Sequence, residues 1–145
     1  YIEAYAGGGG GSDPAPWPTE DVATEMEKLV PGTTTVIPAL LGDEYYVEYY
    51  EDEEVVILDV YGLTTTAQLA AYANVLEAAG WTVEDSEDYP GYEYFALSPA
   101  EDVIIDAYLA QDRSGNLLIE LVIYAYETPS YLKVDRFLIL AEYTT

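Results

Sequence analysis

The segment YYVEYYEDEEVVILDVY, residues 45–61, has the clearest structural pattern in this chain. Two runs rich in Tyr, Val and Ile, residues 45–50 and 55–61, flank the acidic tetrapeptide 51–54. Residues of these types favour strands, and a short polar break between two such runs is typical of a hairpin. We therefore expect two adjacent antiparallel strands here.

Amphipathic helices are expected on both sides of this hairpin. Residues 20–30 place apolar side chains at helical spacing, and Pro31-Gly32 ends the run. Thr65 and Gln68 have the spacing of a capping box that opens a helix over residues 67–79. The expected apolar faces are Val22, Met26, Leu29 and Val30 on the first helix, and Leu69, Tyr72, Ala73, Leu76 and Ala79 on the second.

Further strands are expected at residues 81–84, 92–97, 103–109 and 117–126, and the turn 112–116 joins the last two. This order predicts an α+β fold, with an antiparallel sheet and two helices packed on one face. We divide the chain into an N-terminal strand arm with a Gly/Pro tether, a compact domain and a C-terminal strand extension, at residues 1–16, 17–127 and 128–145.

The charge of the chain restricts its partners. It has 28 Asp and Glu against 4 Lys and Arg, no His and a net charge of -24. Such a chain repels nucleic-acid phosphates and anionic lipid, so we expect neither as a partner. No apolar run reaches the length of a membrane span, and we expect no membrane insertion. The first residue is Tyr1, which we interpret as the start of a processed, mature chain.

Catalysis is not expected. The absence of Cys and His excludes thiol nucleophiles, Ser-His triads and His-based metal sites, and no cofactor motif is present. The densest acidic clusters, residues 51–54 and 84–88, do not match a calcium-loop pattern, so we interpret them as solvated turns. Asp85, Glu87 and Asp88 remain the weaker candidates for binding a divalent cation.

The two ends of the chain carry the candidate subunit interface. Residues 1–6 alternate like a strand, and five glycines tether them to the domain. Such an arm can add to the open edge of a neighbour's sheet, or pair with its own domain; a cloning linker is the other interpretation of the glycines. Near the other end, four consecutive apolar residues need cover from the domain or from a neighbour. The candidate interface residues are Tyr1, Ile2, Glu3, Ala4, Tyr5, Ala6, Phe137, Leu138, Ile139 and Leu140.

Three local features carry a resemblance to known proteins. They are Trp17-Pro18 before the first helix, the loop at Ile37-Pro38 and the segment AAGWTV at residues 78–83. With these features residues 17–127 resemble small α+β domains of Gram-positive cell-surface proteins, and the N-terminal arm resembles that of donor-strand filament subunits. The resemblance implies an extracellular or cell-surface setting.

These observations favour a structural subunit of an extracellular filament or surface assembly, joined head to tail by strand donation from the N-terminal arm. The partner is then a second copy of the chain, with divalent cations as further candidates. One alternative is a monomeric, acidic, Tyr-rich adhesive or ligand-binding domain, because Tyr is common at contact surfaces. A second alternative is an acidic mimic of nucleic acid.

Overall fold

The computed structural model describes residues 15–126, which fold as a single sheet with two helices. Residues 1–14 and 127–145, where the two strand extensions are expected, lie outside the described residues. The helices are α2 (Thr19–Leu29) and α3 (Thr66–Ala78). The strands are β1 (Glu44–Tyr50), β2 (Val55–Tyr61), β3 (Thr82–Asp85), β4 (Glu93–Leu97), β5 (Val103–Gln111) and β6 (Leu117–Ala125).

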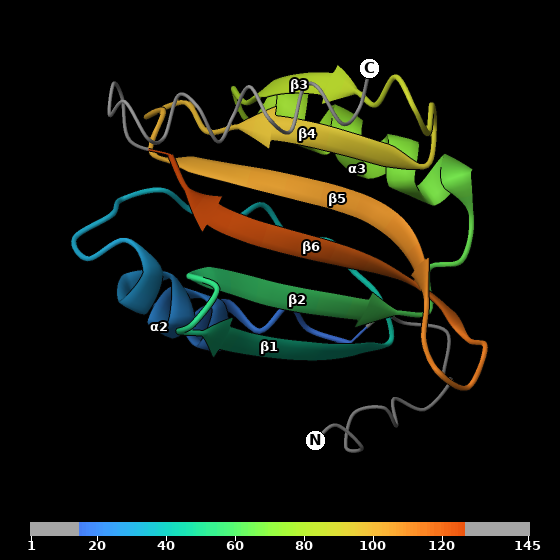
Figure 1. The fold of residues 1–145 in the computed structure, drawn as a ribbon, viewed down its shortest axis with the longest axis horizontal. Coiled ribbons are helices and arrows are strands. Elements are labelled where there is room, and N and C mark those ends of the chain that lie inside the picture. Colours follow the sequence, from blue (N-terminus) through green and yellow to red (C-terminus); the bar gives the residue numbers. More distant parts are fainter. Residues whose placement is uncertain (1–14, 127–145) are drawn as a thin grey trace.

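The six strands form one antiparallel sheet in the order β1-β2-β6-β5-β4-β3 (Figure 1). The predicted hairpin is confirmed, because β1 pairs with β2 from Glu44↔Tyr61 to Tyr50↔Val55. The hairpin joins the rest of the sheet through β2 and β6, whose residues Val55 and Tyr124 are register partners. Strand β1 and the short strand β3 are therefore the two edges of this sheet.

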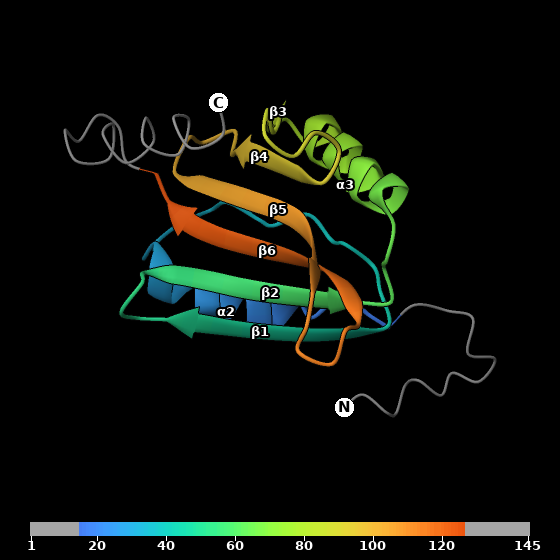
Figure 2. The ribbon, with the colours of Figure 1, turned by 45° about the vertical axis from the view of Figure 1, so that its right-hand side comes forward.

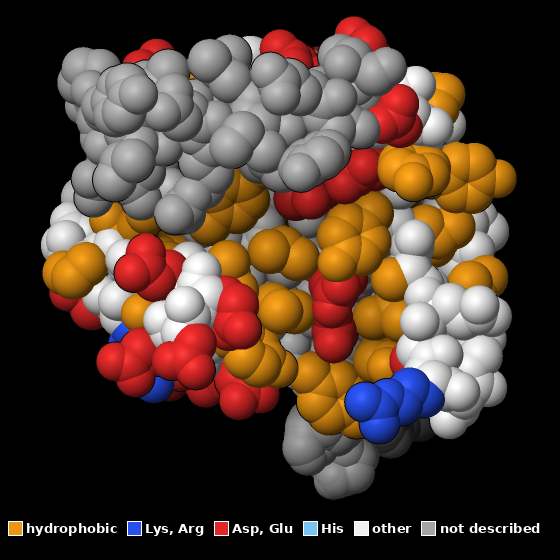
Figure 3. All heavy atoms as spheres, in the orientation of Figure 1, with side chains coloured by type: hydrophobic (Ala, Val, Ile, Leu, Met, Phe, Trp, Pro, Cys, Tyr) orange, Lys and Arg blue, Asp and Glu red, His pale blue; other side chains and the backbone are white. Residues whose placement is uncertain are grey.

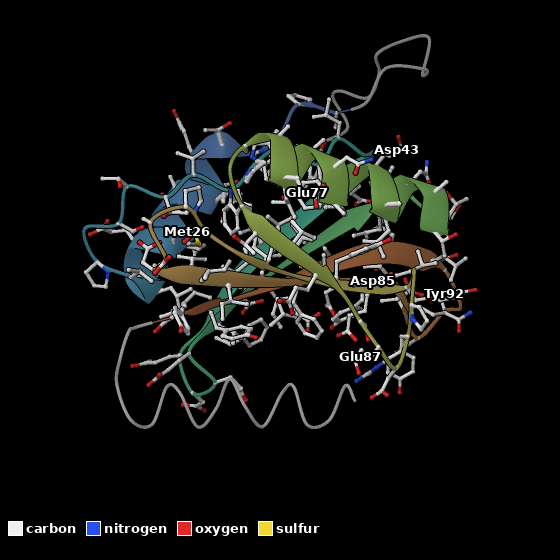
Figure 4. All side chains as sticks on the ribbon, turned by 90° about the horizontal axis from the view of Figure 1, so that it is seen from above. Met26, Asp43, Glu77, Asp85, Glu87 and Tyr92 are labelled. Carbon is white, nitrogen blue, oxygen red and sulfur yellow. The ribbon has the colours of Figure 1, made fainter. Side chains whose placement is uncertain are left out.

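Both helices pack on the same face of the sheet, as the sequence predicts (Figures 2 and 4). On α2, Val22 and Met26 are buried, and Met26 lies between the helix and the sheet (Figure 4). On α3 the capping box is present, with the Thr65 hydroxyl accepting a hydrogen bond from the Gln68 N–H at 3.1 Å. The α+β class, with two helices on one face, is confirmed.

The hydrophobic core lies between the helices and the inner face of the sheet. Leu69, Tyr72 and Leu76 of α3 are buried, and the Tyr72 hydroxyl donates to the Pro38 carbonyl at 2.7 Å. That bond satisfies a polar group that would otherwise be costly to bury. The sheet contributes buried residues from its four central strands, among them Val56, Leu58, Val60, Ala96, Val103, Ile105, Ala107, Ile119, Leu121 and Ile123.

The prediction for the end of α3 needs one correction. Ala79 was expected on the apolar face, but it is exposed because the helix already ends at Ala78. Gly80 follows with a φ of +95°, a conformation that glycine adopts at little cost, and the chain turns there toward β3. Within residues 15–126, no helix is both long enough and apolar enough to cross a membrane.

Candidate binding surface

The face of the sheet opposite the helices is the most unusual surface of the molecule, and we call it the open face. Figure 3 looks onto it, and hydrophobic side chains surround a group of carboxylates in its middle. The strand register arranges its outward side chains in rows that run across the strands. Three of these rows matter here: an apolar row, a mixed row and a row rich in carboxyl groups.

The apolar row lies at the end of the sheet where β6 ends. A second, mixed row lies next to it, with apolar residues and an aspartate side by side. A solvated sheet face normally carries polar side chains, so this apolar content sets the open face apart. From β1 to β4 the apolar row contains Tyr50, Val55, Tyr124, Ile104 and Leu97, and from β1 to β3 the mixed row contains Glu48, Ile57, Val122, Asp106, Phe95 and Glu84.

The carboxyl row follows next along the strands. From β1 to β4 it contains Tyr46, Asp59, Glu120, Tyr108 and Glu93, which are successive register partners. The Tyr108 hydroxyl donates a hydrogen bond to the Glu120 carboxylate. Three carboxyl groups thus lie in one row, on β2, β6 and β4, with Tyr108 of β5 between Glu120 and Glu93 and with Asp106 diagonally beside them in the mixed row.

Two of the carboxyl groups on the open face have raised pKa values. Burial raises the pKa of Asp59 to about 7, and the hydrogen bond and charge of Glu120 add to the effect. Burial also raises the pKa of Asp106 to about 9, with contributions from Glu93 and then from the charge of Glu120. Among the described residues, Oδ1 of Asp59 and Oδ1 of Asp106 are buried without a hydrogen-bond partner. Ionising these groups is therefore costly in the structure as described.

The open face also contains a small hollow of about 80 Å³ at the β3–β4 side of the sheet. Its walls come from both the apolar and the mixed row, with Phe95, Leu97 and Ile104 as the large apolar members. It has room for part of an apolar side chain but not for a drug-sized ligand.

The second candidate surface is the edge strand β1. Within residues 15–126, β1 pairs with β2 only, so the backbone groups on its other side have no neighbouring strand. Its Tyr45, Val47 and Tyr49 side chains face the helices, whereas Tyr46 and Tyr50 are exposed on the open face. A seven-residue edge with an uninterrupted register is a template for an added strand.

A groove of about 470 Å³ lies on the helix side of the molecule. It is lined by Thr34, Thr35, Val36, Pro38, Ala79, Trp81, Pro99 and Ala100. The loop on one side of this groove is fixed by Asp102, whose carboxylate accepts hydrogen bonds from Thr33 Oγ1 at 2.7 Å, Thr35 Oγ1 at 2.7 Å and Ser98 Oγ at 2.9 Å. Partial burial opposes ionisation of Asp102, but these hydrogen bonds outweigh it and lower its pKa.

We expect Asp102→Ala to destabilise the domain by about 2 kcal/mol, because three hydroxyl groups lose their charged acceptor. The loss should be seen in urea unfolding at pH 7. Since the pKa of Asp102 is lowered on folding, the difference from the wild-type chain should shrink as pH falls below about 4. Glu87→Ala, at an exposed turn position, is the control. A loss for Asp102→Ala no larger than for Glu87→Ala would contradict the assigned role.

The site residues expected from the sequence are placed only in part. Asp85 and Glu87 lie at the turn between β3 and β4 (Figure 4), and Asp85 Oδ1 accepts a hydrogen bond from the Gly91 N–H at 3.0 Å. Within residues 15–126, no three His, Cys, Asp or Glu residues are grouped so that they could hold a metal ion. The ten candidate interface residues lie outside the described part of the chain.

The carboxyl groups of the open face were not singled out from the sequence. From the sequence, only the dense acidic clusters are considered as candidate cation sites, and residues 51–54 are interpreted as a solvated turn, which they are. The sequence feature that indicates these carboxyl groups is a single acid within each of the otherwise apolar strands β2, β5 and β6. These acids are Asp59 in VVILDVY, Asp106 in VIIDAYLAQ and Glu120 in LLIELVIYA.

Comparison with known proteins found no matching family model, no matching curated protein and no matching solved structure. The function of this chain is therefore inferred from its own surfaces.

Proposed function

We propose that this chain is a non-catalytic structural subunit of an extracellular filament or surface assembly, in which residues 1–6 of one copy add as a strand to β1 of the next. The observation that carries the proposal is β1 itself, a seven-residue edge strand that pairs on one side only within the described sheet. The other edge strand, β3, has four residues and offers a much shorter template.

The side chains of the arm match those of β1. In one alignment Ile2, Ala4 and Ala6 extend the layer of Tyr45, Val47 and Tyr49 on the helix side. Tyr1, Glu3 and Tyr5 then lie beside the exposed Tyr46 and Tyr50 on the open face. Backbone hydrogen bonds supply affinity in such a contact, and alternate side chains supply specificity.

Charge opposes this contact and makes it dependent on salt. Glu44 and Glu48 are exposed on β1, Glu3 would lie close to them, and the whole chain carries a net charge of -24. Charged residues on an edge strand discourage indiscriminate pairing. Screening at about 0.15 M salt acts over ~8 Å, so added salt should strengthen the contact.

The contact is head to tail, because the arm and its acceptor are different surfaces of the same subunit. A head-to-tail contact continues as a filament unless its rotation closes a ring. We propose an extracellular setting for the filament. The chain has few Lys and Arg residues and therefore offers few sites to trypsin-like proteases, which fits such a setting.

A peptide experiment tests the acceptor. A chain that begins at residue 12 should bind the hexapeptide YIEAYA with a Kd of about 1 mM or tighter. NMR shift changes should be largest at residues 44–50, and binding should strengthen with added salt. The control peptide, with Ala4→Pro, loses a backbone donor and should bind at least about tenfold more weakly. Shift changes centred on β3, or none at all, would argue against donation to β1.

The groove of about 470 Å³ favours one alternative, a ligand-binding surface domain. Its volume lies in the usual range for small-molecule sites. If the full chain stays monomeric at all concentrations and salt conditions, this alternative becomes the better account.

A further inference from the structure

The open face is too apolar to be an ordinary solvated surface. Ile57, Val122 and Phe95 occupy outward positions on three inner strands, and the hollow of about 80 Å³ lies beside them. Both helices lie on the other face (Figure 2). Large apolar patches on a protein surface generally mark a contact, so this face needs a partner.

The carboxyl groups on the same face identify the charge of that partner. Glu93 and Glu120 lie among apolar side chains, one on each side of Tyr108 in the carboxyl row. A cationic group would stabilise the ionised forms of these acids. The fitting partner therefore combines apolar side chains with positive charge.

One segment of this chain has that combination. The chain has only four basic residues. Lys28 pairs with Glu25 at 3.1 Å on α2, and Arg113 lies in the turn between β5 and β6. The other two are Lys133 and Arg136, with Asp135 between them, and Arg136 immediately precedes the apolar run Phe137-Leu138-Ile139-Leu140.

Connectivity places the start of this segment beside the open face. Strand β6 ends at Ala125, and the Tyr126 N–H donates to the Asp102 carbonyl at 2.8 Å, so the chain leaves the sheet beside the apolar row. Seven residues from Tyr126 to Lys133 reach up to about 23 Å, roughly the width of six strands. A segment tethered this closely has a high effective concentration at its own face.

We propose that residues 128–145 cover the open face of their own subunit, with the apolar run 137–140 against the apolar and mixed rows and with Lys133 and Arg136 at Glu93 and Glu120. The sequence predicts a subunit interface for Phe137 to Leu140. Under this proposal these residues cover their own domain instead, independently of where the N-terminal arm binds.

Carbodiimide cross-linking of the wild-type chain tests this proposal directly. The reagent joins amines to nearby carboxylates, and the chain has only two lysines. We expect Lys133 to link to Glu84, Glu93 or Glu120 at least tenfold more often than to Glu77, which is exposed on α3. Lys28 should link to Glu25 and serves as an internal control. Links from Lys133 that are spread evenly over both faces would overturn the proposal.

Mixing isotopically light and heavy chains identifies the source of the segment. Links within one chain support the proposal, whereas links between light and heavy chains would mean that the segment covers a neighbour and would overturn it. A second measurement uses cysteine pairs in this Cys-free chain. Val122→Cys with Leu138→Cys should form an intrachain disulfide at least tenfold faster than Glu77→Cys with Leu138→Cys, and equal rates would contradict the proposal.

Discussion

Deleting residues 1–11 should abolish assembly and leave the domain folded. The deletion removes the proposed donor strand and most of its tether, but none of the residues that form the helices, the sheet or the core. We expect the full chain to form concentration-dependent, head-to-tail oligomers in light scattering and fibres in negative-stain microscopy. The shortened chain should remain monomeric at the same concentration and salt.

Thermal unfolding separates this effect from a folding defect. The melting temperature of the shortened chain at low concentration should lie within about 3 °C of that of the full chain, because less than 1 kcal/mol of domain stability is at stake. A matched control deletes glycines 8–10 and keeps residues 1–6, so it should still assemble. Normal polymerisation of the shortened chain, or its unfolding, would refute a donor arm that is separate from the core.

Asp106 should make the stability of the folded chain depend strongly on pH. Its pKa is about 9 in the folded chain and near 4 in an unfolded one, so the folded state binds an extra proton between these values. Stability from this group is therefore fully present below about pH 4 and is lost as pH rises toward about 9. Asp59, with a pKa of about 7, contributes in the same direction over a narrower range.

Replacing Asp106 by Asn should remove much of this pH dependence, because the amide has the shape of the protonated acid but cannot ionise. We expect Asp106→Asn to be more stable than the wild-type chain by about 3 kcal/mol at pH 8 and by much less at pH 4. The control, Asp52→Asn, removes the same formal charge from the exposed β1–β2 turn and should have a small effect. Urea unfolding across this pH range measures both, and parallel profiles for the two variants would contradict a buried, protonated Asp106.

Local features of the fold could be predicted from the sequence, because neighbouring residues determine them. The hairpin around residues 51–54 and the capping box of Thr65 and Gln68 are both of this kind. The pairing of β2 with β6 could not be predicted, since it joins residues as distant as Val55 and Tyr124. Many strand orders satisfy the same alternation of apolar and polar residues.

The candidate surfaces likewise combine features that the sequence predicts with features that depend on the strand order. The exposed turn at residues 51–54 is evident from composition, whereas the carboxyl row depends on the order β2-β6-β5-β4, which places β2 beside β6. Asp59 and Glu120 become neighbours only through the β2–β6 register, and the contribution of Glu120 to the raised pKa of Asp59 follows from it. The free edge of β1 likewise depends on the complete strand order.

Disulfide trapping between two different chains tests whether residues 1–6 of one subunit add to β1 of another, and it is practical because the chain has no cysteine of its own. One chain carries Glu3→Cys, and the other carries Tyr46→Cys, at an exposed position of β1. We predict that mild oxidation of the mixture gives a covalent dimer of the two chains, at least tenfold more than a mixture with Thr82→Cys on the β3 edge. A disulfide that forms only when both cysteines are in one chain, with none between chains, would contradict strand donation between subunits.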